Sequence, residues 1–342
     1  MVNVGVIGLG VMGTTHLDAY ASITDANVVA VADRIAAKLR GEDRDKGNID
    51  GQAGSGGGFD LSKVKHYAEG TDLIHDPGIE MVDICLATPL HAEFAIEALN
   101  AGKHVLIEKP FARTGGEAER IRQVAVKAKG MAMCAMCMRF WPGWDWLKAA
   151  VDSGRYGPVR SATFRRVGEH PGGPFYSSGE RSGGAILDLH IHDSDFVQHL
   201  LGVPEAVTSR GYKKVTDHID HVTTFYHYPD GPHVVAEGSW AMAKGFGFSM
   251  TYCVNFQNAT AVFDLSKDKP LTLYEPGKEP VAVELEPGMG YVPELAYFID
   301  CIQTGRTPRR VTLEDAALSV LIVEAESRSV ETGQTQKIPE PG

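Results

Sequence analysis

The pattern that most constrains this chain is G-x-G-x-x-G, which follows the apolar run Val4–Ile7 near the N-terminus. In such a turn the first glycine permits a tight bend, the second lets the backbone approach a pyrophosphate, and the third lets the next helix pack closely on the strand. The N-terminus of that helix then faces the phosphates. We therefore expect a dinucleotide site here. The residues expected to contact the dinucleotide are Gly8, Gly10, Val11, Met12 and Gly13.

An acidic residue stands where such a site needs one. The second apolar run, Val28–Ala32, ends at Asp33, about 20 residues beyond the last glycine, where a carboxylate can accept hydrogen bonds from the adenosine ribose. The same carboxylate repels a 2′-phosphate, so the sequence favours NAD over NADP. NADP stays open because the adjacent Arg34 could offset that repulsion or stack on adenine. The plainer alternative is that Asp33 only caps a helix.

Short apolar runs alternate with helical patterns through the first part of the chain. This alternation predicts βαβ units and a doubly wound parallel sheet of the Rossmann type, with helices on both faces. Residues 41–60 are rich in glycine and charge, and we expect a flexible insertion loop there. The expected strands are 4–7, 28–32, 65–67, 81–87, 104–107 and 131–138, and the expected helices are 14–22, 91–100 and 117–129.

Beyond Pro142 the residue pattern changes. Segments rich in β-branched and aromatic residues are separated by turn residues such as Pro229-Asp230-Gly231, which indicates an open, mostly antiparallel sheet. The expected helices in this part are 183–201, 294–304 and 313–331. The chain is therefore expected to have an α/β fold with two domains. These are a Rossmann domain over 1–123 and an α+β domain over 124–342.

Composition and charge exclude several kinds of partner. The 342 residues include 33 Lys and Arg against 44 Asp and Glu, a formal net charge of −11, so the chain lacks the basic face of a nucleic-acid binder. No apolar run approaches the roughly 18 residues of a membrane span, and no secretory signal is visible after Met1. Five cysteines make a disulfide framework unexpected, which favours a cytoplasmic protein.

Two polar motifs stand at the C-terminal ends of expected parallel strands, where open α/β sheets bind ligands. Thr88-Pro89-Leu90-His91 follows one of these strands, and Glu108-Lys109-Pro110 follows the next. Farther along the chain, Asp188 and His192 are four residues apart, so a helix would place both side chains on one face. These residues are the candidates for binding and chemistry.

In these motifs the chain resembles the Gfo/Idh/MocA family, named for glucose–fructose oxidoreductase and inositol dehydrogenase. The resemblance implies a Rossmann domain, an α+β domain whose sheet supports homodimers or homotetramers, and NAD(P)-dependent chemistry on sugars or cyclitols. The residues that carry it are Gly8–Gly13, Asp33, Thr88-Pro89-x-His91, Glu108-Lys109-Pro110 and Asp188-x-x-x-His192. The cofactor contacts added by the resemblance are Thr88, Pro89, His91, Glu108 and Lys109.

Two features depart from the usual family pattern. The 41–60 insertion lengthens the loop after the ribose-binding strand. His190 stands where a glycine is more usual, which predicts a narrower substrate pocket or an added polar contact.

Transfer of a hydride from an alcohol carbon needs a group that takes the hydroxyl proton and one that stabilises the developing oxyanion. His192 suits the first task because an imidazole titrates near physiological pH. Asp188 can orient the substrate or the imidazole, and Lys109 can hydrogen-bond the reacting oxygen or share in proton transfer. Each residue alone could equally be structural, as a helix cap, a core histidine or a surface lysine; their joint occurrence in the family motifs favours catalysis.

Several further residues are candidates for the substrate site. Of Arg165 and Arg166, adjacent on an expected strand, at most one can point inward. No metal is expected, because on a helix His190 and His192 would diverge by about 200°. The substrate candidates are His16, Arg139, Arg165, Tyr176 and His190, with a structural role equally open for His16.

Together these patterns predict an enzyme that interconverts a secondary alcohol and a ketone of a sugar, sugar derivative or cyclitol, with NAD or NADP as cofactor. One alternative is a glycosidase or epimerase-like lyase that retains NAD and recycles the hydride. Another is a sensor of the same fold without catalysis, which the presence of Lys109, Asp188 and His192 together disfavours.

Overall fold

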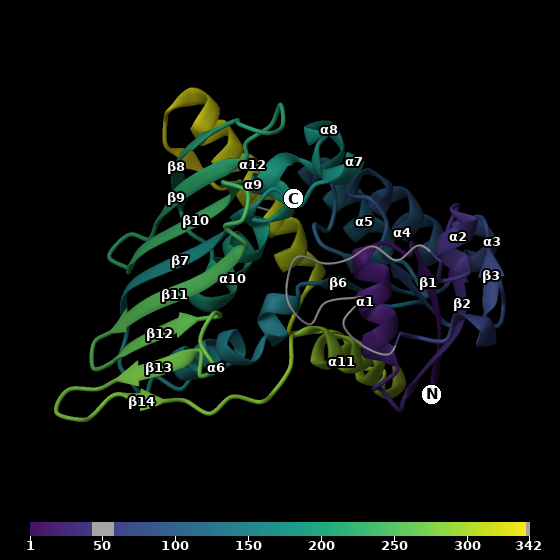
Figure 1. The fold of residues 1–342 in the computed structure, drawn as a ribbon, viewed down its shortest axis with the longest axis horizontal. Helices are drawn as coiled ribbons and strands as arrows, with labels where there is room; N and C mark the ends of the chain where they lie inside the picture. Colours follow the sequence, from purple (N-terminus) through teal and green to yellow (C-terminus); the bar gives the residue numbers. More distant parts are fainter. Residues whose placement is uncertain (43–57, 340–342) are drawn as a thin grey trace. The chain divides into compact units, whose positions relative to one another are not determined.

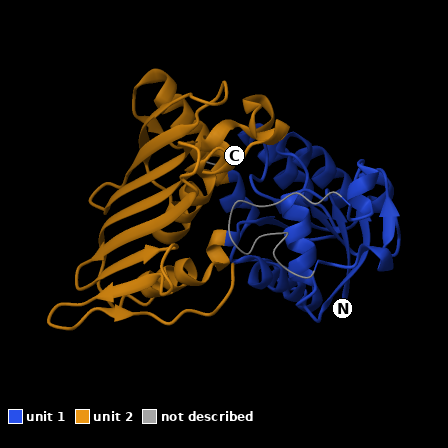
Figure 2. Ribbon diagram, in the orientation of Figure 1, with its two compact units in different colours: residues 1–137, 290–317, 342 blue, residues 138–289, 318–341 orange. Residues whose placement is uncertain are grey.

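The computed structural model describes residues 1–42 and 58–339, so the core of the expected insertion loop lies outside the described residues. The chain divides into two compact units (Figure 2). Within the described residues, unit 1 comprises Met1–Cys137 and Gly290–Ala317, and unit 2 comprises Met138–Met289 and residues 318–339. The boundary between the units thus differs from the one expected at residue 123. Unit 1 extends to Cys137 and includes a second, distant segment.

Unit 1 is built on a six-stranded sheet in the order β3-β2-β1-β4-β5-β6 (Figure 1). Every pair of neighbouring strands is parallel, which confirms the predicted doubly wound arrangement. The predicted strand 131–138 is too long, because a 3₁₀ turn, η3 (Cys137–Phe140), replaces its end. The strands are β1 (Val2–Ile7), β2 (Ala26–Ala32), β3 (Lys65–Tyr67), β4 (Met81–Ile84), β5 (His104–Glu108) and β6 (Ala132–Ala135).

The helices of unit 1 include one from the distant C-terminal segment. Helix α11 (Tyr291–Thr304) packs on α1 (Val11–Tyr20) and on β1, which explains why residues 290–317 belong to this unit (Figure 1). The other helices are α2 (Ala36–Leu39), α3 (Gly70–Ile74), α4 (His91–Asn100) and α5 (Gly115–Ala125), with the 3₁₀ turns η1 (Leu61–Lys63) and η2 (Thr88–Leu90).

Unit 2 is built on a nine-stranded sheet in the order β14-β13-β12-β11-β7-β10-β9-β8-β15. The sheet is antiparallel except where β7 and β10 pair in parallel, in agreement with the prediction. The strands are β7 (Val159–Glu169), β8 (Ala206–Tyr212), β9 (His221–His227), β10 (His233–Met242), β11 (Phe248–Phe256), β12 (Thr260–Asp264), β13 (Leu271–Tyr274), β14 (Val281–Ala282) and β15 (Gln336–Lys337).

One face of this sheet forms the core of unit 2 with the helices. Trp144 of α6 is fully buried, with ring-centroid distances of 4.7 Å to Phe196 and 5.4 Å to Tyr252, both edge-on. Such edge-to-face packing adds to the free energy gained from burying apolar area. The helices of unit 2 are α6 (Pro142–Asp152), α7 (Gly173–Tyr176), α8 (Gly179–Ser182), α9 (Gly184–Asp188), α10 (Ile191–Leu201) and α12 (Leu313–Thr332), the last of which begins in unit 1.

The prediction of a single helix over 183–201 is wrong. The chain instead forms α9 and α10, separated by Leu189 and His190. At the break, the amide of His190 donates to the carbonyl of Ala185, five residues back, while the amide of His192 donates to that of Leu189, three residues back. These bonds interrupt the i to i−4 ladder of an α-helix, so Asp188 and His192 lie on separate helices.

Polar pairs are buried beside the aromatic core. The guanidinium of Arg139 donates to both carboxylate oxygens of Asp195 on α10, at 2.9 and 2.7 Å, and both side chains are 1% exposed. Asp195 also accepts a hydrogen bond from Ser319. A buried pair this well bonded fixes how α10 sits in the core, because neither charge can be left alone there.

None of the helices within the described residues is long and apolar enough to cross a membrane. None of the five cysteines, all within the described residues, forms a disulfide, and Cys134 and Cys137, three residues apart, are both buried.

The close approach at Gly13 generates a first prediction. A Cβ atom at this position would lie 1.8 Å from the carbonyl oxygen of Gly8, whereas a Cβ at Gly116 would meet nothing within 4 Å. Gly13→Ala should therefore lower the free energy of unfolding by about 2–3 kcal/mol or more. The control Gly116→Ala, on an exposed helix position, should be neutral or stabilise by up to about 1 kcal/mol. Urea unfolding of both variants measures the difference, and equal stabilities would contradict it.

The Arg139–Asp195 pair generates a second prediction. Arg139→Met leaves the Asp195 carboxylate buried without its counter-charge, which should cost about 3–5 kcal/mol of unfolding free energy. Lys278→Ala breaks an exposed pair with Glu275 and should cost less than about 1 kcal/mol. Thermal and urea unfolding compare the two. A small loss in Arg139→Met would show that the buried pair does not hold α10.

Candidate functional site

The glycine turn has the geometry that its sequence predicts. Gly8 follows β1 with φ at +93°, and a Cβ there would lie 2.5 Å from the carbonyl oxygen of Cys85. Only glycine satisfies both the left-handed backbone and this close approach. Gly13, in the first turn of α1, brings that helix against the carbonyl of Gly8. Gly8 thus permits the tight turn, and Gly13 permits the close packing of the helix on the strand.

The N-terminus of α1 suits an anionic ligand. Gly10 occupies the N-cap position with extended backbone, no side chain caps the helix, and its first turn contains no acidic residue. The amides of Val11, Met12 and Gly13 belong to this first turn, where N–H groups have no acceptor within the helix. A pyrophosphate would find both amide donors and the positive end of the helix dipole there. The glycine turn therefore fits a dinucleotide.

Asp33 follows β2 and holds the glycine turn directly. Its Oδ2 accepts a hydrogen bond of 2.8 Å from the amide of Leu9, and its Oδ1 accepts one of 2.8 Å from the amide of Ile35. The N-cap position of α2 is Ile35, so Asp33 is not the helix cap of the plainer alternative. Each carboxylate oxygen keeps a lone pair for a ribose hydroxyl. Arg34 is exposed and pairs with Glu69 at 3.0 Å.

The Thr88–His91 segment ties two strand ends together. Thr88 is buried and Pro89 exposed in η2, and His91 begins α4. The His91 ring is buried, with Nδ1 2.7 Å from the carbonyl oxygen of Pro110 and Nε2 2.9 Å from that of Leu86. Burial lowers the pKa of His91. His91 thus links the end of β4 to the segment after β5.

Lys109 directly follows β5 and is half-buried. Its backbone amide donates a hydrogen bond of 3.0 Å to Oε2 of Glu108, whose side chain is largely buried. The peptide bond between Lys109 and Pro110 is cis. In unit 1 the structure therefore brings the candidate cofactor residues to the ends of β1, β2, β4 and β5, the edge at which parallel sheets bind ligands.

His16 is placed differently from its expected reach toward the substrate. It lies on α1 with its ring fully buried, Nδ1 2.8 Å from Oδ2 of Asp83 and Nε2 3.0 Å from Oε1 of Glu108. The Oδ2 atom of Asp83 also accepts a hydrogen bond of 2.9 Å from Tyr20. Burial lowers the pKa of His16, but Asp83 and Cys85 outweigh burial and raise that pKa well above its ordinary value.

His16, Asp83 and Cys85 are the one group of potential metal ligands among residues 1–42 and 58–339, with ligand atoms within 4.8 Å of one another. The 2.8 Å contact between Nδ1 and Oδ2 is a hydrogen-bond distance, with a proton between the two atoms. Hydrogen bonding accounts for the group without an ion.

In unit 2, Asp188 and His192 are both half-buried, Asp188 at the end of α9 and His192 in the first turn of α10. Tyr176, on α7, is half-buried as well, with its ring 5.9 Å from that of Trp240 and nearly perpendicular to it. These three residues keep part of their surface available to a ligand.

Two arginines predicted at the substrate site are placed elsewhere. Arg139 is buried and bonded to Asp195 in the core of unit 2. Of the adjacent pair on β7, Arg166 points toward the helices and pairs with Asp193 at 2.9 Å, as alternation requires. Arg165 points to the opposite face of the sheet and pairs with Glu237 of β10 at 2.9 Å. Neither Arg139 nor Arg165 is placed as a substrate ligand.

His190, predicted to narrow the substrate pocket, lies inside unit 2. Its ring is fully buried, with Nε2 3.4 Å from the Tyr226 hydroxyl and 3.6 Å from Oε1 of Glu326. Burial lowers its pKa, but Glu326 outweighs burial and raises it. Gly238 makes the space for this ring, since a Cβ there would lie 2.6 Å from Nδ1 of His190. The residue is therefore part of the packing of unit 2.

Sequence reasoning missed the acids that hold these histidines. Asp83 stands alone in the buried strand Met81–Ile84, and Glu326 follows the apolar stretch of the last helix and is itself fully buried. An acid within a fully apolar strand is costly to bury without a partner. That cost was the available signal that Asp83 has a buried cationic neighbour.

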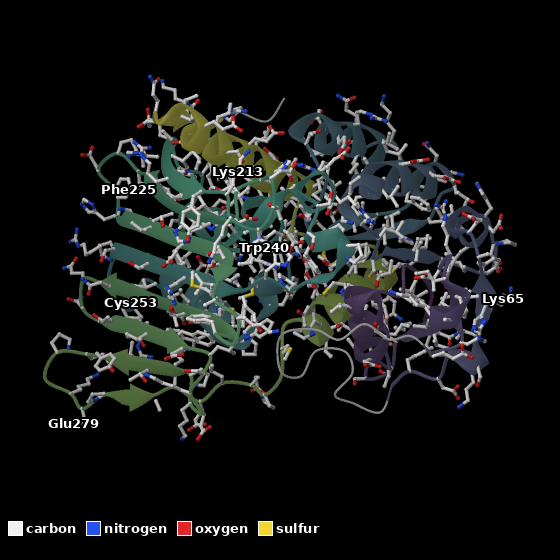
Figure 3. The ribbon with its side chains drawn as sticks, turned by 45° about the horizontal axis from the view of Figure 1, so that its top comes forward. Lys65, Lys213, Phe225, Trp240, Cys253 and Glu279 are labelled. Carbon is white, nitrogen blue, oxygen red and sulfur yellow. The ribbon has the colours of Figure 1, made fainter. Side chains whose placement is uncertain are left out.

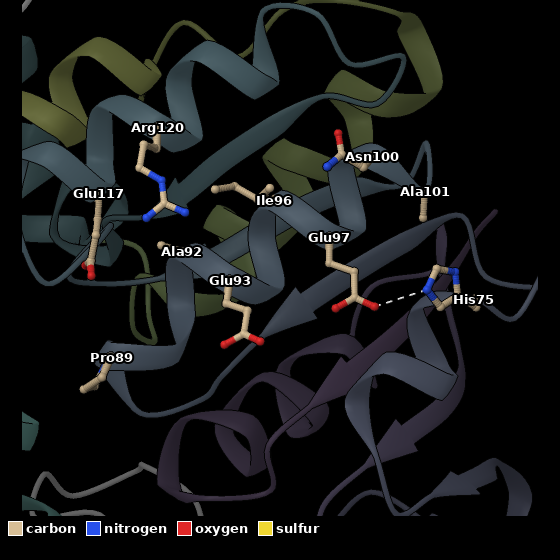
Figure 4. A pocket seen from close by; sticks show the side chains of 10 residues that line it. All are labelled: His75, Pro89, Ala92, Glu93, Ile96, Glu97, Asn100, Ala101, Glu117 and Arg120. Atoms are coloured by element: carbon tan, nitrogen blue, oxygen red, sulfur yellow. Dashed lines mark hydrogen bonds and ion pairs between the residues drawn. The ribbon is translucent and has the colours of Figure 1, made fainter.

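The outer surface of α4 and α5 carries an open groove (Figure 4). Glu93, Glu97, Glu117 and Arg120 line it, and Glu97 reaches His75 at 3.1 Å. Of the candidate cofactor residues within the described chain, Pro89 alone lines this groove. The groove is therefore separate from the candidate site.

Comparison with known proteins relates both halves of the chain to one family. The family model described as an oxidoreductase family with an NAD-binding Rossmann fold matches residues 2–136, and the GFO/IDH/MocA C-terminal domain matches residues 144–262. Myo-inositol 2-dehydrogenase of Thermotoga maritima is 27% identical over 354 residues, covering 98% of each chain. Levoglucosan dehydrogenase of Pseudarthrobacter phenanthrenivorans is 32% identical over 218 residues, covering 60% of this chain and 53% of the relative.

Solved structures agree with this relationship at the level of the fold. A levoglucosan dehydrogenase in complex with NADH superimposes with a TM-score of 0.86 at 22% identity, over 99% of both chains. An oxidoreductase from Agrobacterium radiobacter, in complex with NAD⁺, L-tartaric acid and magnesium, gives a TM-score of 0.84 at 20% identity over 98% of both chains. With matches to both domain models of the family, the chain belongs to the GFO/IDH/MocA oxidoreductase family.

Proposed function

We propose that this protein is an NAD-dependent dehydrogenase that oxidises a secondary hydroxyl of a cyclitol or sugar, or reduces the corresponding ketone. The observation that carries the proposal is the glycine turn of Gly8–Gly13 bonded to Asp33, at the same sheet edge as Lys109. An uncapped helix end beside a ribose-binding acid suits a dinucleotide, and a lysine at that edge suits an alcohol or carbonyl oxygen.

The residues proposed to hold the cofactor come from four strand ends of unit 1. The amides at the start of α1 would bind the pyrophosphate, and Asp33 would bind the adenosine ribose. The Asp33 carboxylate favours a free ribose hydroxyl over a 2′-phosphate, which is the basis for NAD over NADP. Once bound, the nicotinamide supplies the chemistry of accepting or donating a hydride.

The chain's own contribution to the reaction is the movement of a proton and the stabilisation of charge. We assign His192 the removal of the hydroxyl proton, since an imidazole accepts protons near neutral pH. Asp188 orients the substrate or the imidazolium that forms. Lys109 donates a hydrogen bond to the reacting oxygen, where its charge stabilises the oxyanion of the transition state. All three side chains are half-buried, which leaves them accessible.

The relatives support a polyol as the substrate. The myo-inositol 2-dehydrogenase matches along 98% of both chains, whereas the levoglucosan dehydrogenase alignment covers 60% of this chain. Cyclitols are therefore the first substrates to test, followed by levoglucosan and free aldoses. A glycosidase or lyase that recycles the hydride would retain NAD on purification and give no net NADH.

We also propose that the protein acts in the cytoplasm as a homodimer or homotetramer. Five free thiols suit a reducing compartment. The sheet face of unit 2 opposite the helices offers a surface for self-association. It carries Phe225 on β9 and Cys253 on β11 (Figure 3).

Substitution of the proposed catalytic residues should separate chemistry from cofactor binding. Lys109→Ala and His192→Ala should each lower kcat by about 100-fold or more with a cyclitol substrate. NADH binding, measured by fluorescence titration, should stay within a few-fold of the unchanged protein. Lys63→Ala and His75→Ala remove exposed residues of the same types and should leave kcat unchanged. Near-normal turnover in both Lys109→Ala and His192→Ala would remove the catalytic assignment.

Replacement of Asp33 should change the cofactor preference. Asp33→Asn keeps an oxygen for the Leu9 amide but loses the charge that repels a 2′-phosphate. The ratio of the NADPH to the NADH dissociation constant should therefore fall by about tenfold or more. Calorimetric titration with both cofactors measures the ratio. An unchanged ratio would show that Asp33 does not set the preference.

A further inference from the structure

Several polar side chains are buried together around His16. We define the His16 cluster as His16, Tyr20, Asp83, Cys85 and Glu108, which come from α1, from β4 and the residue after it, and from β5. His16 stands between two acids, with Asp83 2.8 Å from Nδ1 and Glu108 3.0 Å from Nε2. The contact to Glu108 has the distance of an ion pair, although its atoms are out of line for a hydrogen bond.

This geometry favours a proton on both ring nitrogens. An unprotonated Nε2 would place its lone pair near a carboxylate oxygen 3.0 Å away, in a region with little water to screen the repulsion. The imidazolium supplies the one positive charge between two acids. Burial raises the pKa of Cys85, and burial together with Asp83 raises that of Tyr20, so the thiol and the phenol stay neutral donors to Asp83.

Each element packed around the ring contributes a group that faces it or its partners. From α11 come the Tyr291 ring, 6.4 Å from that of His16, and Glu294, which is close enough to help raise the pKa of Tyr20.

The cluster is connected to the proposed catalytic lysine. The Glu108 carboxylate that faces His16 through Oε1 accepts the Lys109 amide through Oε2. On the other side of Lys109, the carbonyl of Pro110 is bonded to His91. The Lys109 backbone is therefore held on both sides by groups that buried histidines fix in place.

We propose that His16 is a positioning residue for Lys109: its imidazolium holds the Glu108 carboxylate, which in turn holds the backbone amide of Lys109. The inference rests on the proposed function only in the role that it gives to Lys109. His16 neither touches substrate nor moves a proton. Loss of its charge would free Glu108, and an error of about 1 Å in the position of a catalytic group can cost 100-fold in rate.

A double-mutant cycle tests the connection. His16→Gln keeps a donor for Asp83 but removes the charge, and Glu108→Gln keeps an oxygen for the Lys109 amide. Each single variant should lower kcat by about 10- to 100-fold with little change in KM or in the dissociation constant of NADH. If both act through one connection, the double variant should be no slower than the slower single variant. The proposal would be overturned if the losses of kcat in the two single variants multiply in the double variant. It would also be overturned if His16→Gln keeps a kcat within about twofold of normal.

The control is His75→Gln, which removes an exposed histidine that also pairs with an acid, Glu97. It should leave kcat and KM unchanged. A purely structural role for His16 would lower the melting temperature without this selective loss of kcat, so thermal unfolding accompanies the kinetics.

Two measurements need no activity and keep the proposal testable if His16→Gln fails to fold or the protein oxidises no polyol. In ¹⁵N spectra of the unchanged protein, both ring nitrogens of His16 should be protonated at about pH 7, above the ordinary pKa of a histidine, because each lies about 3 Å from a carboxylate oxygen. Hydrogen exchange of the Lys109 amide should be slow in the unchanged protein and faster in Glu108→Gln. A neutral His16 ring or an unprotected Lys109 amide would overturn the proposal, whereas absent polyol oxidation with both signals present would overturn only the proposed function.

Discussion

The contact between the backbone of Gly8 and the start of α1 is the constraint on which unit 1 depends. With 1.8 Å between the carbonyl oxygen of Gly8 and the place of a Cβ at Gly13, the helix can approach β1 only because position 13 has no side chain. That approach places the helix N-terminus over the sheet edge and brings the Leu9 amide to Asp33. One backbone contact thus sets the direction of α1, the shape of the turn and the position of Asp33.

The sequence was sufficient for the parts of the fold that local patterns determine. The glycine turn, Asp33 at the end of the second strand and the parallel order of unit 1 all follow from residues close together in the chain. The return of residues 290–317 to unit 1 could not be predicted in this way, because it depends on α11 matching the surface of α1 and β1. Local periodicity carries no information about a partner almost three hundred residues away.

The same limit applies to the candidate site. Its polar residues were found from motifs, but motifs do not distinguish a charge that meets a ligand from one that meets a buried partner. Arg139 and His190 were predicted at the substrate site, yet Asp195 and Glu326 hold them inside unit 2. The break between α9 and α10 also escaped prediction, since it arises from hydrogen bonds three and five residues back, and the helical pattern of side chains continues through it.

The path of the chain has a consequence for how the protein is made. The chain passes between the units at residues 137/138, 289/290 and 317/318, so neither unit is a continuous segment. During synthesis, the side of α1 that α11 covers stays exposed until residues 291–304 have left the ribosome. A nascent Rossmann half is therefore open to aggregation or chaperone binding for most of translation, and no single cut in the gene would yield unit 1 complete.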